Sequence, residues 1–339
     1  MQVFAKSPCR VDLAGGTLDI WPLYVYHPNA VTLNFAVSVY TSCRIMPHDG
    51  SSITLRSQDQ NLEETFDSLA TLQTAARARN VLAAQVVKYF RPEGGLVVET
   101  NSESPQGAGI AGSSALLIST VSAFNKFCGT RHNIEQVREI AQNIEAQVVN
   151  VPTGCQDYYP AMYGGVSAID LTVAGIQHNS MAVDLEELNS RFVLAYTGKP
   201  RNSGINNWEV MKLHIDGDKR VRKNFARIAE IAHAMRGALN KKDWDETGRL
   251  LREEWSHRKK NAPGISTPLI DHLVASTKKS GAKAAKVCGA GGGGCVVFLC
   301  EPDARDRVAA AIEKEGASEG VKVLPVEAAP KGVVVKTLS

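Results

Sequence analysis

The amino-acid sequence predicts an α+β protein of two lobes with a cleft between them. Its 339 residues, 44% of them hydrophobic, are enough to bury one substantial core or two apposed cores. Strand-forming segments dominate the start of the chain, whereas long amphipathic helices dominate its later part. The composition changes near residues 184–191, and we place the boundary there. The first lobe then spans residues 1–185 and the second spans residues 186–339.

The first lobe is expected to begin with β-strands. Residues 3–45 have a strand-like pattern, rich in Val, Thr, Phe and Tyr, which is broken by a turn at Gly15 and Gly16. Residues 69–90 then carry Ala, Leu, Val and Gln at helical spacing. Residues 95–100 follow as a buried strand that ends in a polar loop.

Two helices and a strand are expected after this loop. Residues 115–127 are apolar on nearly every side, which predicts a buried helix. A second helix should begin at Asn133, because its side chain has capping-box spacing with Gln136. Pro152 ends that helical segment, and a strand pattern resumes at residues 166–171.

The second lobe is expected to mix strands with amphipathic helices. No internal repeat or low-complexity segment interrupts it. The predicted elements are a strand over 192–196, helices over 206–241, 244–260 and 267–280, strands on either side of 289–294, a helix over 305–315 and a strand over 322–327.

Charge and composition exclude several classes of partner. Lys and Arg number 38 against 35 Asp and Glu, and a net charge of +3 is too small for nucleic acid without a concentrated basic stripe. The most basic segment, residues 219–223, is typical of a solvated helix face. Neither a secretory signal nor a run of eighteen apolar residues occurs. We therefore expect a monomer or homodimer with no nucleic-acid or membrane partner.

Cysteine and histidine usage indicates the compartment and the metal chemistry. The seven cysteines are odd in number, scattered and free of CxxC pairs, which favours reduced thiols in a cytoplasmic protein. The eight histidines form no HxH or HExxH motif, so no fixed zinc or iron site is expected.

A loop of small residues, 104–114, directly precedes the first buried helix. Its sequence is SPQGAGIAGSS, and residues this small permit close approach of another backbone or a ligand. The free N–H groups and positive dipole end of a helix at such a place suit a phosphate. The hydroxyls of Ser113 and Ser114 could reach a phosphate oxygen or a Mg²⁺ ion. The alternative is an ordinary flexible turn, since no Lys follows to complete a Walker motif.

Two further segments combine glycines with functional side chains. Residues 289–294 read GAGGGG between two apolar runs, and so many glycines indicate a required close approach. Residues 7–16 read SPCRVDLAGG and are followed by Thr17 and Asp19, so that an Arg and two carboxylates flank a turn.

These three segments occur in the order and rough positions of the three motifs of the GHMP kinases, the family of galactokinase, homoserine kinase, mevalonate kinase and phosphomevalonate kinase. Residues 105–115 resemble the family's PxGxGLxSSA phosphate loop with one residue more before the serines. Residues 286–297 resemble its C-terminal glycine motif, which supports the first loop. The resemblance covers essentially the whole chain. It implies a β-rich α/β N-terminal lobe, a ferredoxin-like C-terminal lobe and an active site in the cleft.

The first segment is most similar to one branch of this family. SPCRVDLAGGTLD resembles the fucokinase and heptose-7-phosphate kinase branch, where an R-[IV]-[DS]-[LF]-AGG-x-x-D pattern replaces the galactokinase GRVNLIGEHTD. Residues 150–157, NVPTGCQD, line up with the galactokinase-like PxGxxDQ segment, which places Asp157 at the position of the catalytic aspartate.

The resemblance implies a role for each candidate residue. Asp157 would accept or orient the proton of the acceptor hydroxyl, and Arg10 would keep it ionised. Ser113 and Glu145 would complete the shell of a Mg²⁺ ion carried with ATP. The implied ATP-binding loop comprises Pro105, Gly107, Ala108, Gly109, Ile110, Ala111, Gly112, Ser113 and Ser114. The implied substrate-binding residues are Asp19, which suits vicinal sugar hydroxyls, with Gly15, Gly16, Thr153, Gly154, Gly291 and Gly292.

The sequence departs from the family pattern at several positions. Ala111 stands where Gly or Ser is preferred, and Gly112 stands where a magnesium-binding Ser or Thr is usual, so the choice of metal-binding serine stays open. Tyr158 replaces the usual Gln after the aspartate. The HTD-type His and Glu of galactokinase are absent, which makes galactose a less favoured acceptor.

Several of these residues also have a purely structural interpretation. Arg10 and Asp157 could form an ion pair with no catalytic role. Glu145 could be a solvent-facing helix residue, and Asp19 could stabilise a turn.

We therefore expect an ATP- and Mg²⁺-dependent kinase that phosphorylates a hydroxyl, the anomeric one, of a sugar or sugar phosphate, as a D-glycero-D-manno-heptose 7-phosphate kinase does. Lys199 and Arg201 could contact a phosphate on the acceptor, although exposed cations in turns are commonly idle. The alternatives are a kinase of another hexose, fucose- or galactose-like, a kinase of an isoprenoid or homoserine-like alcohol, and a non-catalytic regulator that binds sugar and ATP. The AGG-x-x-D segment argues against the kinase of an isoprenoid or homoserine-like alcohol, and the presence of both Arg10 and Asp157 argues against the regulator.

Overall fold

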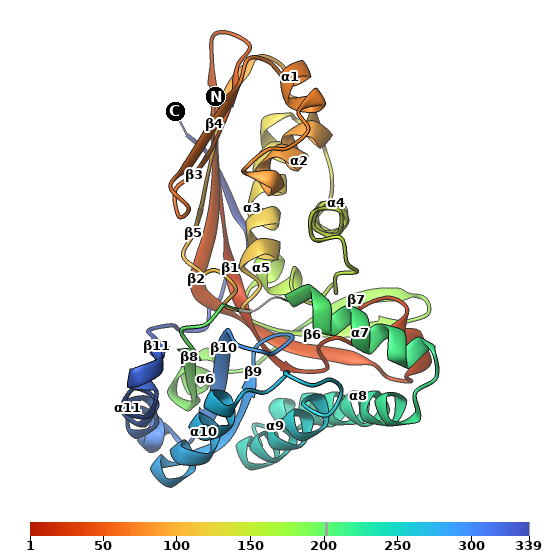
Figure 1. The fold of residues 1–339 in the computed structure, drawn as a ribbon, viewed down its shortest axis with the longest axis vertical. Coiled ribbons are helices and arrows are strands. Elements are labelled where there is room, and N and C mark those ends of the chain that lie inside the picture. Colours follow the sequence, from red (N-terminus) through yellow and green to blue (C-terminus); the bar gives the residue numbers. More distant parts are fainter. Residues whose placement is uncertain (201–202, 339) are drawn as a thin grey trace.

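The structure, a computed structural model, describes residues 1–200 and 203–338 and confirms the mixed α+β fold. Figure 1 shows an upper lobe in which helices stand beside a long sheet, and a broader lower part that contains a second, smaller sheet. The larger sheet is mixed, because β3 and β5 run parallel while the other pairs are antiparallel. The smaller sheet is antiparallel throughout.

The larger sheet has the strand order β12-β1-β2-β5-β3-β4, with β6 paired to β2 and β7 to β6. Strand β2 is long enough to pair with β5 through residues 41–48 and with β6 through residues 31–35, so it runs through both parts of the molecule. The strands are β1 Gln2–Ala14, β2 Val31–His48, β3 Ile53–Ser57, β4 Leu62–Phe66, β5 Gly95–Ser102, β6 Val166–Thr172, β7 Gly175–Met181 and β12 Val334–Leu338.

Helices cover this sheet, and most residues of α3 are buried. Its apolar sequence places it against β1 and β2, where the Ser7 hydroxyl donates a hydrogen bond to the carbonyl oxygen of Ala115 at 2.7 Å. Helix α4 starts after Asn133, which forms the expected capping box with Gln136. The helical elements here are η1 Leu23–Tyr26, α1 Leu69–Thr74, α2 Val81–Phe90, α3 Gly112–Phe127, α4 Ile134–Val149, α5 Tyr159–Tyr163 and α6 Leu185–Arg191.

The smaller sheet has the order β11-β8-β10-β9, which is the strand arrangement of a ferredoxin-like lobe. Its strands are β8 Phe192–Tyr196, β9 Ala282–Val287, β10 Cys295–Cys300 and β11 Lys322–Leu324. The helical elements of this part are α7 Ser203–Ile215, α8 Lys219–Asn240, α9 Trp244–Arg258, α10 Pro268–Ser276, η2 Thr277–Ser280, η3 Pro302–Ala304, α11 Arg305–Gly316 and η4 Ala317–Glu319.

Several elements differ from the sequence-based expectation. The helix expected over residues 69–90 is two helices, because Asn80 caps a new helix through its side chain. The hairpin of β3 and β4 was not expected. The last strand, β12, lies after residue 186 in the sequence but pairs with β1 of the larger sheet. Pairing of this kind depends on contacts between distant segments, which local patterns do not contain.

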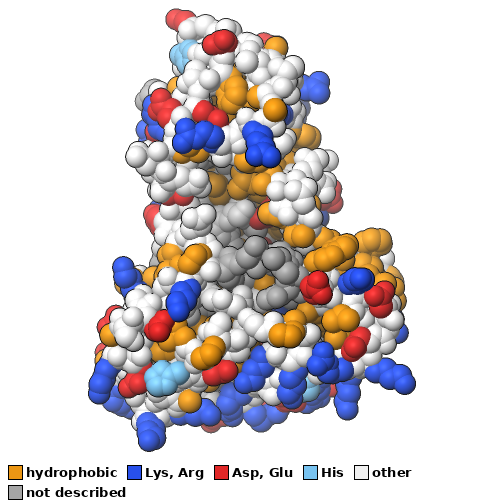
Figure 2. Space-filling view, viewed as in Figure 1, with side chains coloured by type: hydrophobic (Ala, Val, Ile, Leu, Met, Phe, Trp, Pro, Cys, Tyr) orange, Lys and Arg blue, Asp and Glu red, His pale blue; other side chains and the backbone are white. Residues whose placement is uncertain are grey.

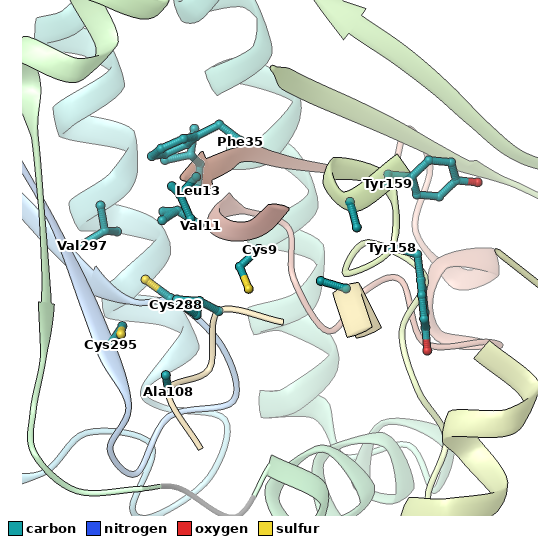
Figure 3. Close-up of a cluster of buried hydrophobic side chains, with 14 of the residues drawn as sticks. Cys9, Val11, Leu13, Phe35, Ala108, Tyr158, Tyr159, Cys288, Cys295 and Val297 are labelled. Atoms are coloured by element: carbon teal, nitrogen blue, oxygen red, sulfur yellow. The ribbon is translucent and has the colours of Figure 1, made fainter. Parts of the chain in front are cut away.

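The two lobes share one continuous hydrophobic core. Figure 3 shows the part at the junction, where Cys9 and Val11 of β1 lie with Phe35 of β2 near Cys288 and Val297 of the second lobe. A shared core holds the lobes in one arrangement and so positions the segments between them. Among the helices described, none is long and apolar enough to cross a membrane.

Candidate active site

A cleft of about 830 Å³ lies where the two lobes meet. Figure 2 shows the same narrow upper part and broader lower part in space-filling form. Four segments bring functional groups to the cleft, and we name them as follows: the acceptor turn (residues 15–20), the phosphate loop (residues 104–114), the connector (residues 152–157) and the glycine turn (residues 289–294). The cleft therefore brings together all the motifs found in the sequence.

Most of the predicted site residues line this cleft. They are Arg10, Asp19, Pro105, Gly107, Ala108, Gly109, Ala111, Gly112, Ser113, Ser114, Glu145, Thr153, Gly154 and Asp157.

Five of the predicted site residues do not line the cleft, namely Ile110, Gly15, Gly16, Gly291 and Gly292. Ile110 is fully buried in the core. A Cβ on Gly15 would lie 2.1 Å from the carbonyl oxygen of Val31, and one on Gly291 would lie 2.3 Å from that of Ile265. These two glycines are required because the chain passes directly against a neighbouring backbone.

Arg10 connects the segments around the cleft. It lies on β1, where the pairing with β2 is interrupted twice by register shifts, and it is only 2% exposed. Its Nε and Nη2 donate to Asp157 Oδ1 at 3.0 and 2.7 Å, and its Nη1 donates to the carbonyl oxygens of Gly109 at 2.7 Å and Cys288 at 2.6 Å. The rigid guanidinium thus holds the connector, the phosphate loop and the chain before the glycine turn in fixed relative positions.

The phosphate loop ends where α3 begins. Gly107, Gly109 and Ala111 have φ angles of 66°, 74° and 62°, so the loop needs small residues in left-handed conformations. The carbonyl oxygen of Ala108 accepts a hydrogen bond from the backbone N–H of Cys295 at 2.6 Å. The C-terminal glycine motif therefore supports the loop directly. The first N–H groups of α3 lack partners within the helix and lie at the cleft, an arrangement suited to phosphate oxygens.

Asp19 and Asp157 bring two carboxylates to the cleft. Asp19 is buried and accepts a hydrogen bond from the backbone N–H of Gln156 at 2.9 Å. Burial, together with the negative charge of Asp157, raises the pKa of Asp19 to about 7. A Cβ on Gly154 would lie 2.0 Å from Asp19 Oδ2, so the glycine makes room for this carboxylate.

Glu145 points into the protein rather than into solvent. Its Oε2 accepts hydrogen bonds from the hydroxyls of Ser114 at 2.8 Å and Tyr158 at 2.5 Å. Burial raises the pKa of Glu145, and hydrogen bonds from Tyr158, Ser113 and Ser114 partly offset that rise. Sequence reasoning noted Tyr158 only as a departure from the family pattern, whereas the structure shows that it holds Glu145 in place.

A buried group of four charged residues beneath the acceptor turn was missed by sequence reasoning. Lys286 Nζ lies 2.9 Å from Asp12 Oδ2 and 3.4 Å from Glu254 Oε1, and Arg258 Nε donates to Glu254 Oε1 at 2.8 Å. Burial alone would raise the pKa of Asp12, but Lys286 and Arg258 hold it below its ordinary value. Asp12 and Arg258 also line the cleft. The exact spacing of these residues in the chain carries no motif that could have indicated the group.

The remaining candidates lie elsewhere. Lys199 Nζ pairs with Glu319 at 2.7 Å on an exposed surface and does not line the cleft, while Arg201 falls outside the described residues. Within residues 1–200 and 203–338, no three His, Cys, Asp or Glu side chains are grouped so that they could hold a metal ion by themselves.

Comparison with known proteins decides the family. The model of the GHMP kinase N-terminal domain matches residues 75–165, and that of the GHMP kinase C-terminal domain matches residues 235–318. The chain belongs to the GHMP kinase family. It is therefore an ATP-dependent kinase that transfers a phosphoryl group to an alcohol acceptor.

Similarity to individual GHMP kinases spans nearly the whole chain. A D-glycero-α-D-manno-heptose 7-phosphate kinase of Campylobacter jejuni is 25% identical over 318 residues, covering 91% of this chain and 93% of the relative. A mevalonate kinase of Saccharolobus solfataricus is 24% identical over 305 residues, covering 88% and 90%. The crystal structure of a D-glycero-D-manno-heptose 1-phosphate kinase from Bacteroides thetaiotaomicron has a TM-score of 0.79 at 23% identity and covers 99% of both chains. At this identity, the similarity to the B. thetaiotaomicron structure shows a shared fold.

Proposed function

We propose that this GHMP kinase phosphorylates a hydroxyl, the anomeric one, of a sugar or sugar phosphate, with D-glycero-D-manno-heptose 7-phosphate as the first candidate acceptor. The observation that carries the proposal is the pair of carboxylates, Asp19 and Asp157, in one part of the cleft. Carboxylate oxygens accept hydrogen bonds from vicinal hydroxyls, which a sugar presents. The C. jejuni relative that acts on a heptose 7-phosphate supports this choice of acceptor.

The mechanism assigns one task to each group. The phosphate loop holds the ATP phosphates through its backbone N–H groups and the start of α3. Asp157 accepts the proton of the acceptor hydroxyl as that oxygen attacks the γ-phosphoryl group. Arg10, donating to Asp157 at 2.7 Å and to the carbonyl oxygen of Gly109, orients this carboxylate and places it beside the phosphate loop. ADP then leaves, and the transferred phosphoryl group stays on the acceptor.

The residues around Glu145 fit the Mg²⁺ ion that GHMP kinases use with ATP. A buried carboxylate beside two serine hydroxyls offers only oxygen donors, and Mg²⁺ usually takes one or two carboxylates together with phosphate oxygens and water. Glu145 with Ser113 or Ser114 would hold it. When bound, the ion neutralises charge on the phosphates.

Charge in the cleft favours a sugar over mevalonate. Arg10 and Arg258 are the cations that line the cleft within the described part of the chain, and they are already paired with Asp157 and Glu254. The carboxylate of mevalonate would therefore meet Asp19 and Asp157 with no uncommitted cation among these residues. An uncharged sugar presents hydroxyl donors instead and avoids that repulsion, whereas the phosphate of a sugar phosphate needs a cation other than these two.

The first experiment measures ADP release with Mg·ATP across aldoses, sugar phosphates including heptose 7-phosphates, mevalonate and homoserine, with phosphorus NMR of each product. An anomeric phosphate formed from one acceptor supports the proposal. Turnover restricted to mevalonate or homoserine contradicts it. Tight ATP binding without turnover of any acceptor would favour the non-catalytic regulator instead.

The pH dependence of acceptor use should report on Asp19. Its pKa is about 7, so below that pH the carboxyl is protonated and accepts hydrogen bonds from sugar hydroxyls less well. We expect kcat/KM for the acceptor to rise by up to about tenfold per pH unit below 7 and then to level off. Steady-state kinetics from pH 5 to 9 test this. The Asp19→Asn variant should lose the step near pH 7, and a step of unchanged height in that variant would assign it to another group.

The metal dependence should report on Glu145. Glu145→Gln keeps the side-chain shape but removes the charge, so we expect the Mg²⁺ concentration for half-maximal rate to rise by about tenfold. Titration of Mg²⁺ at saturating ATP measures this. Glu139→Gln on the exposed face of the same helix is the matched control and should behave as the parent does. An unchanged Mg²⁺ requirement in Glu145→Gln would show that Glu145 does not bind the metal. Comparing the Mg²⁺ requirement of Ser113→Ala with that of Ser114→Ala identifies which serine binds it.

A further inference from the structure

The acceptor turn contains a backbone conformation that its own sequence does not favour. Thr17 has a φ of 72°, in the left-handed region that β-branched residues rarely adopt. The turn is closed by hydrogen bonds from the backbone N–H of Leu18 to the Gly15 carbonyl at 3.1 Å, and from that of Ile20 to the Thr17 carbonyl at 3.2 Å. Such a conformation persists when the surroundings hold it from several sides.

Arg258, at the end of α9, holds this turn from the second lobe. Its Nη2 donates to the carbonyl oxygen of Gly16 at 2.9 Å, and its Nη1 donates to the Thr17 hydroxyl at 3.3 Å. The Thr17 hydroxyl also lies 3.5 Å from Asn207 Oδ1 on α7. Two helices of the second lobe therefore contact the turn that leads to Asp19.

The charged group behind Arg258 fixes the direction of its guanidinium. Glu254 accepts from Arg258 and also lies beside Lys286, which in turn contacts Asp12. All four side chains are buried, and their charges sum to zero. A buried ionic group contributes little net stability compared with apolar packing. Its effect here is geometric, because it leaves Arg258 one orientation, with two N–H groups directed at the acceptor turn.

We infer that Arg258 is a positioning residue that holds the acceptor turn and thereby places Asp19 against the acceptor. It acts on acceptor binding rather than on ATP, because its contacts are with the acceptor turn and not with the phosphate loop. This inference rests on the proposed role of Asp19 but does not depend on which sugar is the acceptor.

The test compares Arg258→Lys with Arg249→Lys, a matched change on the exposed face of α9. Lysine keeps the positive charge but lacks the fork that reaches both Gly16 and Thr17. We expect KM for the acceptor to rise by about tenfold or more in Arg258→Lys, because the acceptor turn loses charge-assisted hydrogen bonds. KM for ATP should stay within about twofold of the parent value, because the phosphate loop keeps its contacts. Equal changes in both constants would contradict the inference.

Hydrogen exchange of the ligand-free protein gives a second readout that needs no acceptor. In Arg258→Lys the amides of Leu18 and Ile20 should exchange about tenfold faster, because the turn opens more often. The amide of Ala115, bonded to the Ala111 carbonyl at the start of α3, should keep its rate. Unchanged exchange at Leu18 and Ile20 would overturn the inference. If no sugar is turned over, the proposed function fails while this readout still decides the role of Arg258.

A second variant covers the case in which Arg258→Lys does not fold. Glu254→Gln keeps the volume and removes the charge that orients Arg258. Circular dichroism first confirms folding. We expect the same pattern at reduced size, namely a higher KM for the acceptor, an unchanged KM for ATP and faster exchange confined to the acceptor turn. A uniform rise in exchange across the protein would mean that the charged group serves stability alone.

Discussion

Replacing Asp157 by Asn should lower kcat by about 1,000-fold, the loss expected when a positioned general base is removed. Asparagine fills the same space and still accepts a hydrogen bond from Arg10, but it cannot take the proton of the acceptor hydroxyl. The dissociation constant for ATP should change by less than about threefold, because the phosphate loop is untouched. Single-turnover phosphoryl transfer and ATP titration measure the two quantities.

The matched control for this variant is Asp170→Asn. The side chain of Asp170 is 28% exposed and pairs with Arg236 at 2.8 Å. The side chain of Asp157 is similarly 30% exposed and pairs with Arg10 at 2.7 Å. Unlike Asp157, Asp170 does not line the cleft. The control should keep the parental kcat. If Asp157→Asn retains kcat within a few-fold, the carboxylate is not the base and the ion pair is structural.

Replacing Arg10 by Gln should impair both catalysis and stability. The variant loses the donors to Asp157, Gly109 and Cys288 together. The phosphate loop and the carboxylate of Asp157 are then no longer held in fixed relative positions. We expect kcat to fall by about 100-fold and KM for ATP to rise, as found for the removal of a preorganised electrostatic group. The free energy of unfolding should fall by about 3 kcal/mol, because buried carbonyl oxygens and a carboxylate lose their partner.

The control Arg236→Gln breaks a more exposed pair and should lower the free energy of unfolding by less than about 1 kcal/mol with no change in kcat. Urea unfolding and steady-state kinetics give both quantities. A double-mutant cycle of Arg10→Gln with Asp157→Asn then measures the coupling between them. Loss of stability without loss of kcat would show that Arg10 serves the fold alone.

The candidate site was predictable where it follows from a contiguous motif. The phosphate loop, the connector and the glycine turn each carry their small residues within a dozen positions, because a close backbone approach requires glycine at particular places. Asp157 and Arg10 were proposed to act together although 147 positions separate them, and the structure joins them at 2.7 Å. That pairing came from the resemblance of both segments to one family.

Other parts of the site were not predictable for a physical reason. Arg258 and Lys286 are ordinary cations in the sequence, and what distinguishes them is burial beside Glu254 and Asp12. In the sequence, Tyr158 is only a departure from the family pattern. In the fold, its hydroxyl donates a hydrogen bond to Glu145. Ion pairs between distant segments depend on the packing of α9 and β9 against β1, which no local pattern encodes.

The elements and the chemistry that could be predicted from the amino-acid sequence are those that short-range interactions control. A segment that is apolar on nearly every side predicted the buried α3, the capping box predicted the start of α4, and glycine-rich segments indicated turns that approach a phosphate. Contacts between distant segments bring β12 back to β1, bury Asp19 within reach of the charge of Asp157, and let Arg258 reach across from the second lobe. Burial and charge pairing are properties of the folded environment, and they turn ordinary carboxylates and guanidinium groups into a site.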